Sequence, residues 1–484
     1  MGIENKGLNA AGVLRPAAMA LGLGWGLVAC GQQGVEAPET YTFQSRFSEE
    51  SSVSYTGQTM RQVLIADLKK DIGALTDNID SGSFTPESGD VIARMNFYYD
   101  FDGSTAGTTE HGINTSPGTA QTTYNDIAEG KNLVGKVAGN DEVGQHKDWA
   151  SAFVGWDDPD VSTPASLVEH WFEQLEQLAI DRANGTIPQT PGGDEISEVY
   201  ITESGQDLQQ LIQKFLLGAV AFSQGVDDYL DDDTDGKGLL SDNTESDEGA
   251  AYTSLEHQWD EGFGYFGAAR NYLEYTDEEL AGAGGREAFA NGYHDADGDG
   301  AIDLTSEMNF DYAAYAADRD LGSAEGAKTD YTQDAFEAFV RGRAIIAEAD
   351  GALDEDQLAE LKAQRDIAVT AWEKVIAANV VHYLNATLQD MSTFDSSDYN
   401  FADHAKHWSE MKAFALSLQF NPRTPLTDAQ LSTLQDKMGK APALPDDANV
   451  DAYKTALLDA RALLQDAYGF ADANMGDANG TGGW

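Results

Sequence analysis

Cysteine is nearly absent from this chain, which limits the chemistry that the protein can carry out. Cys30 is the only cysteine among 484 residues. A single thiol cannot form an internal disulfide, so Cys30 is a lipid-attachment point, a buried apolar residue or a reactive thiol. If that thiol carries lipid, any transition-metal site must rest on histidine and carboxylate side chains.

Basic residues are scarce as well. The chain has 29 lysines and arginines against 83 aspartates and glutamates, which gives a formal net charge of −54. A field this negative repels nucleic acid and anionic lipid surfaces, so we expect neither as a partner, and it favours cations. The acidic residues are spread along the whole chain, so a hydrated surface suited to saline surroundings explains the total charge. The alternative, a supply of oxygen ligands for calcium, applies to individual loops.

Long apolar runs are limited to one place near the start. The apolar stretch of residues 16–29 follows Lys6 and Arg15. A positive region, then an apolar core, then small residues is the layout of a secretory signal peptide. The stretch is too short for a comfortable membrane span, which needs roughly 20 residues. No second apolar run approaches that length, so we expect the mature body to be exported and soluble.

The end of this stretch carries a more specific signal. The tetrapeptide Leu27-Val28-Ala29-Cys30 resembles the lipobox of bacterial lipoproteins. The resemblance implies that residues 1–29 are removed and that lipid on Cys30 anchors the chain in the cell envelope. Gly31 stands where some Gram-negative lipoproteins have the aspartate that retains them at the inner membrane. The outer membrane is therefore the expected location, facing either the periplasm or the exterior.

Behind the signal, the sequence predicts one large helical region. The expected divisions are a signal peptide over 1–29, a lipidated tether over 30–50, a helical body over 51–470 and a mobile tail over 471–484. Within the body we expect two bundle halves with a break near 325–350.

Apolar residues at helical spacing locate the individual helices. Residues 80–164 lack this spacing and are expected to be an irregular, partly β insertion. The fold class is therefore all-α with long insertions. The predicted helices cover residues 57–76, 165–182, 205–223, 250–271, 277–290, 306–318, 331–350, 354–391, 401–419, 426–438 and 448–469.

An acidic loop at 294–307 has the pattern of a calcium site. It reads HDADGDGAIDLTSE, with oxygen ligands at alternate positions, a glycine for the sharp turn and an apolar residue at the eighth position of the loop. Its twelfth position is Ser306 rather than the glutamate of an EF-hand, and Glu307 follows one residue later. The alternative is a solvated acidic turn. The expected calcium ligands are Asp295, Asp297, Asp299, Ala301, Asp303 and Glu307.

A second acidic loop, at 231–243, repeats the pattern more weakly. It reads DDDTDGKGLLSDN, and Gly238 replaces the expected apolar residue. An exposed linker explains this segment equally well. The weaker calcium candidates are Asp231, Asp233, Asp235 and Asp242.

Histidines followed by a carboxylate indicate a possible transition-metal site. Residues three apart on a helix share one face, so an imidazole and a carboxylate there can bind one cation. Two predicted helices, within 253–270 and 402–422, carry such pairs and together offer several ligands with a position left for water or substrate. The alternative is that each pair is a hydrogen bond that organises the bundle. The candidate ligands for iron, zinc or copper are His257, Asp260, Glu261, His404, His407 and Glu410.

Several long motifs carry a family resemblance. The runs DLQQLIQKFLLGAVAFSQGVDDYL, EHQWDEGFGYFGAAR and HWSEMKAFALSLQFNP make the chain resemble the imelysin-like proteins, and within them a family of secreted bacterial lipoproteins catalogued as a domain of unknown function. The resemblance implies two packed helical bundles and an H-x-x-E signature linked to metallopeptidase activity and to metal uptake. The matching turn here runs from His257 to Asp260, with aspartate in place of glutamate and Leu255 in place of the usual glycine.

These observations support three functions. The first is a non-catalytic, lipid-anchored protein that binds a metal ion and serves iron or other cation acquisition at the envelope. The second is a metallopeptidase at the same site, whose cleavage activity would be lost on Glu261→Gln, although the chain has no HExxH or HxxEH spacing. The third is a calcium-stabilised binding or adhesion module, in which the histidines make structural hydrogen bonds.

Overall fold

The computed structural model describes residues 37–104, 109–141, 145–349 and 351–484. The predicted signal peptide and the predicted lipid-attachment residue, Cys30, lie outside these ranges. The described residues form fifteen α-helices, and their only β pairing is a set of isolated bridges. This confirms the all-α fold class.

The helices differ widely in length, from one turn to more than ten. Two short π-helical segments, Leu217–Phe222 and Gly225–Tyr229, continue the chain beyond α7. In chain order the α-helices are α1 (Thr56–Gly73), α2 (Leu75–Asp80), α3 (Asp90–Tyr99), α4 (Tyr124–Ile127), α5 (Trp149–Ala152), α6 (Pro164–Ala183), α7 (Leu208–Leu216), α8 (Ser254–Phe266), α9 (Asp277–Leu280), α10 (Asp311–Gly322), α11 (Tyr331–Glu348), α12 (Glu355–Ser392), α13 (Phe401–Ser417), α14 (Asp428–Met438) and α15 (Val450–Tyr468).

Local sequence explains where the principal helices begin. Thr253 caps α8, and its hydroxyl and the Glu256 carboxylate satisfy each other's backbone N–H groups in a capping box. Asp354 and Gln357 form the same arrangement at the start of α12. α8 ends at Gly267, whose φ of +85° is a left-handed conformation that glycine adopts without strain.

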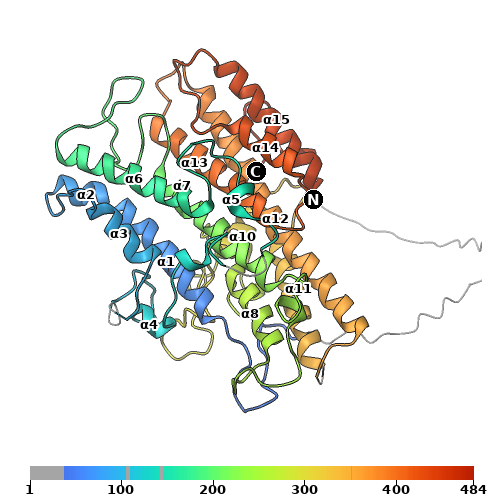
Figure 1. The fold of residues 1–484 in the computed structure, drawn as a ribbon. Coiled ribbons are helices and arrows are strands. Elements are labelled where there is room, and N and C mark those ends of the chain that lie inside the picture. The colour runs from blue at the N-terminus through green and yellow to red at the C-terminus, as the bar shows by residue number, and fades with distance from the viewer. Residues whose placement is uncertain (1–36, 105–108, 142–144, 350) are drawn as a thin grey trace, which may run out of the picture. The chain divides into compact units, whose positions relative to one another are not determined.

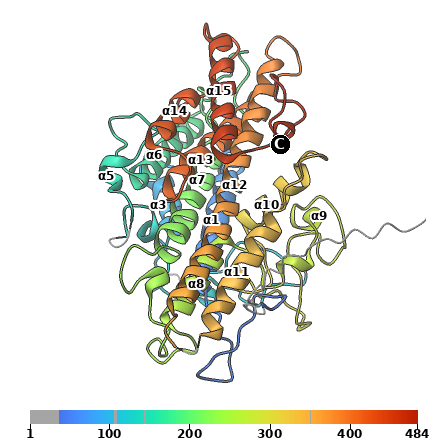
Figure 2. The same ribbon diagram turned by 90° about the vertical axis from the view of Figure 1, so that its right-hand side faces the viewer.

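α12 is the central element of the helical body. It packs along α11 and α13 and also contacts α10 and α15, while α1 packs against α7, α3 and α8. Both ribbon views show α12 beside α11 over part of its length and beside α13 over another part (Figures 1 and 2). Wholly buried aromatic side chains, among them Trp259, Trp372 and Trp408, fill the space between these helices. Burial of such large apolar surfaces is the main source of stability.

The structure corrects several predicted helices. The segment predicted as a helix over 277–290 is helical only at α9, and the one predicted from 306 begins at Asp311. The region over 80–164 contains α3 and no β-strand among its described residues. No helix in the described ranges is long and apolar enough to cross a membrane.

Both ends of the described chain are packed against helices. Tyr41 is wholly buried and stacks on Phe263 of α8 at 3.8 Å between ring centroids. Trp484 is also buried, its indole N–H donates to the Arg319 carbonyl at 2.9 Å, and Asn385 of α12 donates to its backbone oxygen. The predicted tether over 30–50 therefore extends too far along the chain. The segment 471–484, expected to be mobile from its composition, lies against α10 and α12 instead.

Candidate functional site

Three carboxylates of the first acidic loop come together. One oxygen from each of Asp295, Asp297 and Asp299 lies within 4.8 Å of the other two. Among the residues that the structure describes, this is the only group of three or more histidine, cysteine or acidic side chains so close together. Asp295 is half-buried and the other two are exposed, so an ion from solvent can reach them. Hard oxygen ligands in this arrangement suit calcium.

Backbone hydrogen bonds hold the turn that carries these residues. The Asp295 carboxylate accepts from the N–H groups of Gly298 at 2.8 Å and Gly300 at 3.0 Å. Gly298 and Gly300 have φ angles of +75° and +91°, which other residues rarely adopt. The glycines in the motif are therefore required by the shape of the turn.

Other residues of the loop attach it to the body and hold its shape. Ile302 is wholly buried, and its backbone pairs with residues 118–120 through two hydrogen bonds of 2.9 Å. The buried Glu307 carboxylate accepts from the backbone N–H groups of Ala296 and Asp303. Glu307 thus closes the loop on itself, and its carboxylate is not part of the three-aspartate group.

Asp303 has a similar role. Its carboxylate accepts hydrogen bonds from Gln121 at 2.9 Å and from Thr305 and Ser306. Burial favours its neutral form, but these donors outweigh burial and lower the pKa of Asp303. The Ala301 carbonyl accepts no hydrogen bond from any described residue. Of the six predicted ligands, three converge, Ala301 keeps an available oxygen, and Asp303 and Glu307 are structural.

The second acidic loop does not form a comparable group. The Asp231 carboxylate accepts from the Arg423 guanidinium at 2.7 Å and from the backbone N–H of Asp233. Asp242 accepts from Thr244 and orders the turn after it. Asp231, Asp233, Asp235 and Asp242 therefore do not assemble the site that their spacing suggested, because a basic side chain already occupies Asp231.

The α8 residues of the predicted transition-metal site are engaged elsewhere. Nδ1 of His257 donates to the Ser54 carbonyl at 3.0 Å, and its Nε2 lies 3.8 Å from Glu261. Asp260 is 0% exposed and accepts from Arg343 at 2.9 Å and from the Tyr41 hydroxyl at 2.7 Å. An arginine paired with Asp260 leaves no place for a metal ion at that carboxylate.

The α13 residues form no site with those of α8. His404 is wholly buried, its ring stacks on Phe394, and burial lowers its pKa to about 3. Nδ1 of His407 donates to Asp390 at 2.8 Å. Glu410 is buried 3.8 Å from the Lys214 ammonium. The expected two-helix metal centre is therefore not assembled among the described residues.

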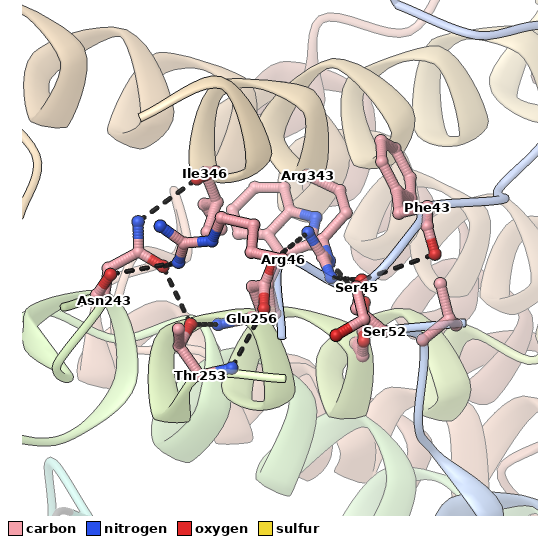
Figure 3. Close-up of polar contacts among 12 residues, drawn as sticks. Phe43, Ser45, Arg46, Ser52, Asn243, Thr253, Glu256, Arg343 and Ile346 are labelled. Carbon is pink, nitrogen blue, oxygen red and sulfur yellow. Dashed lines mark hydrogen bonds and ion pairs between the residues drawn. The ribbon is translucent and has the colours of Figure 1, made fainter. Parts of the chain in front are cut away.

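The partner of Asp260 belongs to a buried ionic network that the sequence did not reveal (Figure 3). We call Arg343, Glu256, Asp260 and Ser52 the Arg343 network. Both carboxylates and the guanidinium are 0% exposed. Besides its bond to Asp260, Arg343 donates to Glu256 at 3.0 Å and to the Ser52 hydroxyl at 2.6 Å. Burial raises the pKa of Asp260, while the positive charge of Arg343 opposes that rise.

A second arginine extends this connection to the N-terminal segment. Arg46 donates to the Asn243 side chain at 2.8 Å and to the Ala349 carbonyl at 3.0 Å. Asn243 in turn donates to the Ile346 carbonyl of α11 and accepts from the Thr253 hydroxyl (Figure 3). These contacts clamp the N-terminal segment onto α8 and α11. In the sequence, the only sign of the Arg343 network is that Arg343 stands among the apolar positions of α11.

Comparison with known families gives one match. The profile of a family described as a domain of unknown function, DUF4856, matches residues 38–444. The chain belongs to this family. The DUF4856 region spans the three-aspartate loop, the Arg343 network and α1 to α14. No curated protein and no solved structure shows a significant match to the chain.

Proposed function

We propose that this DUF4856 protein is a lipid-anchored protein of the cell envelope whose helical body binds calcium in the loop 294–307. The observation that supports this best is the convergence of Asp295, Asp297 and Asp299 on one point. Three like charges at such short range repel one another, and a divalent cation relieves that repulsion. The lipobox-like sequence ending in Cys30 supports the anchor and the outer-membrane location.

The donor set fits calcium better than a transition metal. Calcium takes 6–8 oxygen ligands, so three carboxylates and the Ala301 carbonyl leave places for water. No histidine or thiol lies in the group. In this proposal calcium ties the loop together next to the segment around Gly118, and its role is to stabilise a surface used for binding or adhesion.

Transition-metal uptake and metallopeptidase activity are the alternatives that the imelysin-like resemblance implies. Both need several of His257, Asp260, Glu261, His404, His407 and Glu410 at one ion. Asp260 is instead bound to Arg343, and His407 to Asp390. The geometry therefore favours the calcium proposal over both alternatives.

Metal analysis of the purified full-length protein tests the proposal. We expect about one calcium per chain after dialysis against calcium buffer, lost in an Asp297→Asn, Asp299→Asn double variant. The matched control is Asp233→Asn, Asp235→Asn, which removes the same charge from the second acidic loop and should leave the calcium content unchanged. Stoichiometric iron, zinc or copper without calcium would support the alternatives. Mass spectrometry should find acyl chains on Cys30, and Cys30→Ser should release the protein from the membrane fraction.

A further inference from the structure

A group of charged side chains lies between α7, α10, α12 and α13, away from the calcium loop. We call Lys214, Arg319 and Glu410, with the phenols of Tyr315 and Tyr383, the charged cluster. Its members come from four helices, of which α13 packs against α7 and α12, and α12 packs against α10. Unlike the Arg343 network, the charged cluster leaves several of its strongest hydrogen-bonding groups without partners.

Arg319 is the clearest case. The residue is 8% exposed, yet its guanidinium forms no ion pair and donates no hydrogen bond to any described residue, and its Nε is fully buried. Burial lowers the pKa of Arg319, while nearby Asp318, Tyr383 and Glu410 oppose that effect. A buried N–H group without an acceptor is costly, and native proteins rarely leave one, so the buried Nε of Arg319 lacks a partner that its surroundings should supply.

Glu410 lacks a hydrogen-bond donor, whereas Arg319 lacks an acceptor. It is 3% exposed, its Oε1 lies 3.8 Å from the Lys214 ammonium, and its Oε2 accepts no hydrogen bond from described residues. The Tyr383 phenol lies close to this carboxylate: burial and the charge of Glu410 raise the pKa of Tyr383 well above its usual range. Lys214 donates only to the Tyr315 hydroxyl, and burial lowers its pKa to about 8.

Aromatic rings surround these groups. The Lys214 ammonium lies 4.7 Å from the centre of the Tyr315 ring, and the Phe414 ring lies 5.5 Å from Tyr315 and 6.0 Å from Tyr383. Tyr315 and Tyr383 are only half-buried, so the cluster reaches solvent on their side. The neighbouring Asp311 is already satisfied by Gln213 and Tyr315.

We propose that the charged cluster is a binding site for a small zwitterion of the free α-amino-acid type. Its carboxylate would accept from Arg319 and Lys214, its ammonium would donate to Glu410, and its side chain would contact the rings of Tyr315, Phe414 and Tyr383. A simple anion fits poorly, because Glu410 and the net charge of −54 both repel it. A simple cation is repelled by Arg319 and Lys214. Only a ligand with both charges satisfies the unpartnered donor and acceptor together.

Calorimetric titration of the full-length protein with the twenty free amino acids tests this proposal. Acetate and methylammonium, each carrying half of the zwitterion, serve as controls. We expect at least one amino acid to bind, and we expect both controls to bind at least tenfold more weakly. Binding of acetate alone, or no binding of any amino acid at millimolar concentration, would overturn the proposal, since ordered water would then suffice for Arg319 and Glu410.

Substitutions locate the bound ligand. Arg319→Met and Glu410→Gln should each weaken binding about 10- to 100-fold, because each removes a charge-assisted hydrogen bond. Arg341→Met is the matched control, since Arg341 lies exposed on α11 in a pair with Glu337. The affinity of this variant for the amino acid should stay within twofold of wild type. Unchanged affinity in Glu410→Gln, which keeps the shape of the side chain, would place the ligand elsewhere and contradict the proposal.

Discussion

The three-aspartate loop and the Arg343 network use the same kind of side chain in opposite ways. In the loop, three carboxylates face one another without a basic group among them. In the network, two buried carboxylates lie against one guanidinium. Sequence spacing suggested metal ligands in both places. The difference lies in a basic residue that is distant in sequence and close in space, and it decides which carboxylates remain available to a cation.

The second acidic loop follows the same rule. Its spacing resembles that of the first loop, but Arg423 reaches Asp231 from 192 positions away in the chain. The two loops therefore form a natural pair of test and control. The predictions below remove the basic partner, supply the cation, alter a buried carboxylate or remove two of the histidines.

The largest expected effect comes from removing the basic partner. Arg343→Met should lower the free energy of unfolding by about 3–5 kcal/mol, because Glu256 and Asp260 would stay buried without a counter-charge. Urea denaturation of wild type and variant measures the loss. Arg341→Met, two residues earlier and exposed, should change stability by no more than about 0.5 kcal/mol. Equal losses of stability in the two variants would contradict the claim that a buried arginine matters more for stability than an exposed one.

Supplying the cation should have the next largest effect. Calcium at 100 times its dissociation constant should stabilise the wild type by about 2.7 kcal/mol, as expected for a ligand that binds only the folded state. Thermal unfolding with and without chelator provides the measurement. In chelator, Asp297→Asn, Asp299→Asn should be at least as stable as wild type, because it removes mutual repulsion. A variant that loses stability without calcium would instead mean that these residues have a structural role.

Glu373 is another buried carboxylate, and it tests what happens when no cationic side chain forms an ion pair with such a group. It accepts hydrogen bonds from Tyr468 at 2.8 Å and Asn421 at 2.6 Å, and burial raises its pKa to about 7. Its folded-state pKa exceeds the unfolded value, so its contribution to stability is fully present below about pH 4 and is lost as the pH rises towards 7. Glu373→Gln changes the free energy of unfolding at every pH. We expect that change to be more stabilising at pH 8 than at pH 4, by about 1–3 kcal/mol. Parallel pH–stability curves for the two proteins would contradict this assignment.

The smallest effect concerns the histidines. Because His257 and His407 do not share a site with one another, we expect the His257→Ala, His407→Ala pair to change zinc affinity less than twofold. Titration of metal-free protein with zinc measures this. A loss of tenfold or more would restore the two-helix metal centre and would mean that the bound form rearranges around the ion.

The sequence predicts the features that depend on neighbours along the chain. The apolar stripe over 354–391 predicts α12 nearly to the residue, and the spacing of Asp295, Asp297 and Asp299 predicts their convergence. It fails where distant segments decide the outcome. The pairing of Asp260 with Arg343 spans 83 positions, and no local pattern indicates it.

The same limit explains the errors at the two ends of the chain. The sequence predicts a tether over residues 30–50 and a mobile tail over residues 471–484. Tyr41 is one of three aromatic residues in the first segment and Trp484 is the only one in the second, and each packs against helices formed elsewhere in the chain. One buried aromatic ring can outweigh the local preference of several polar residues. The composition of a segment does not reveal the contacts that one of its residues makes with distant helices.

Calorimetric calcium titration of the wild type and the two loop variants tests the central claim most directly. We predict one calcium site in the wild type, none in Asp297→Asn, Asp299→Asn, and one of unchanged affinity in Asp233→Asn, Asp235→Asn. No heat in the wild type, or loss of binding in the second variant alone, would contradict the claim that the absence of a basic partner makes a carboxylate cluster available to calcium.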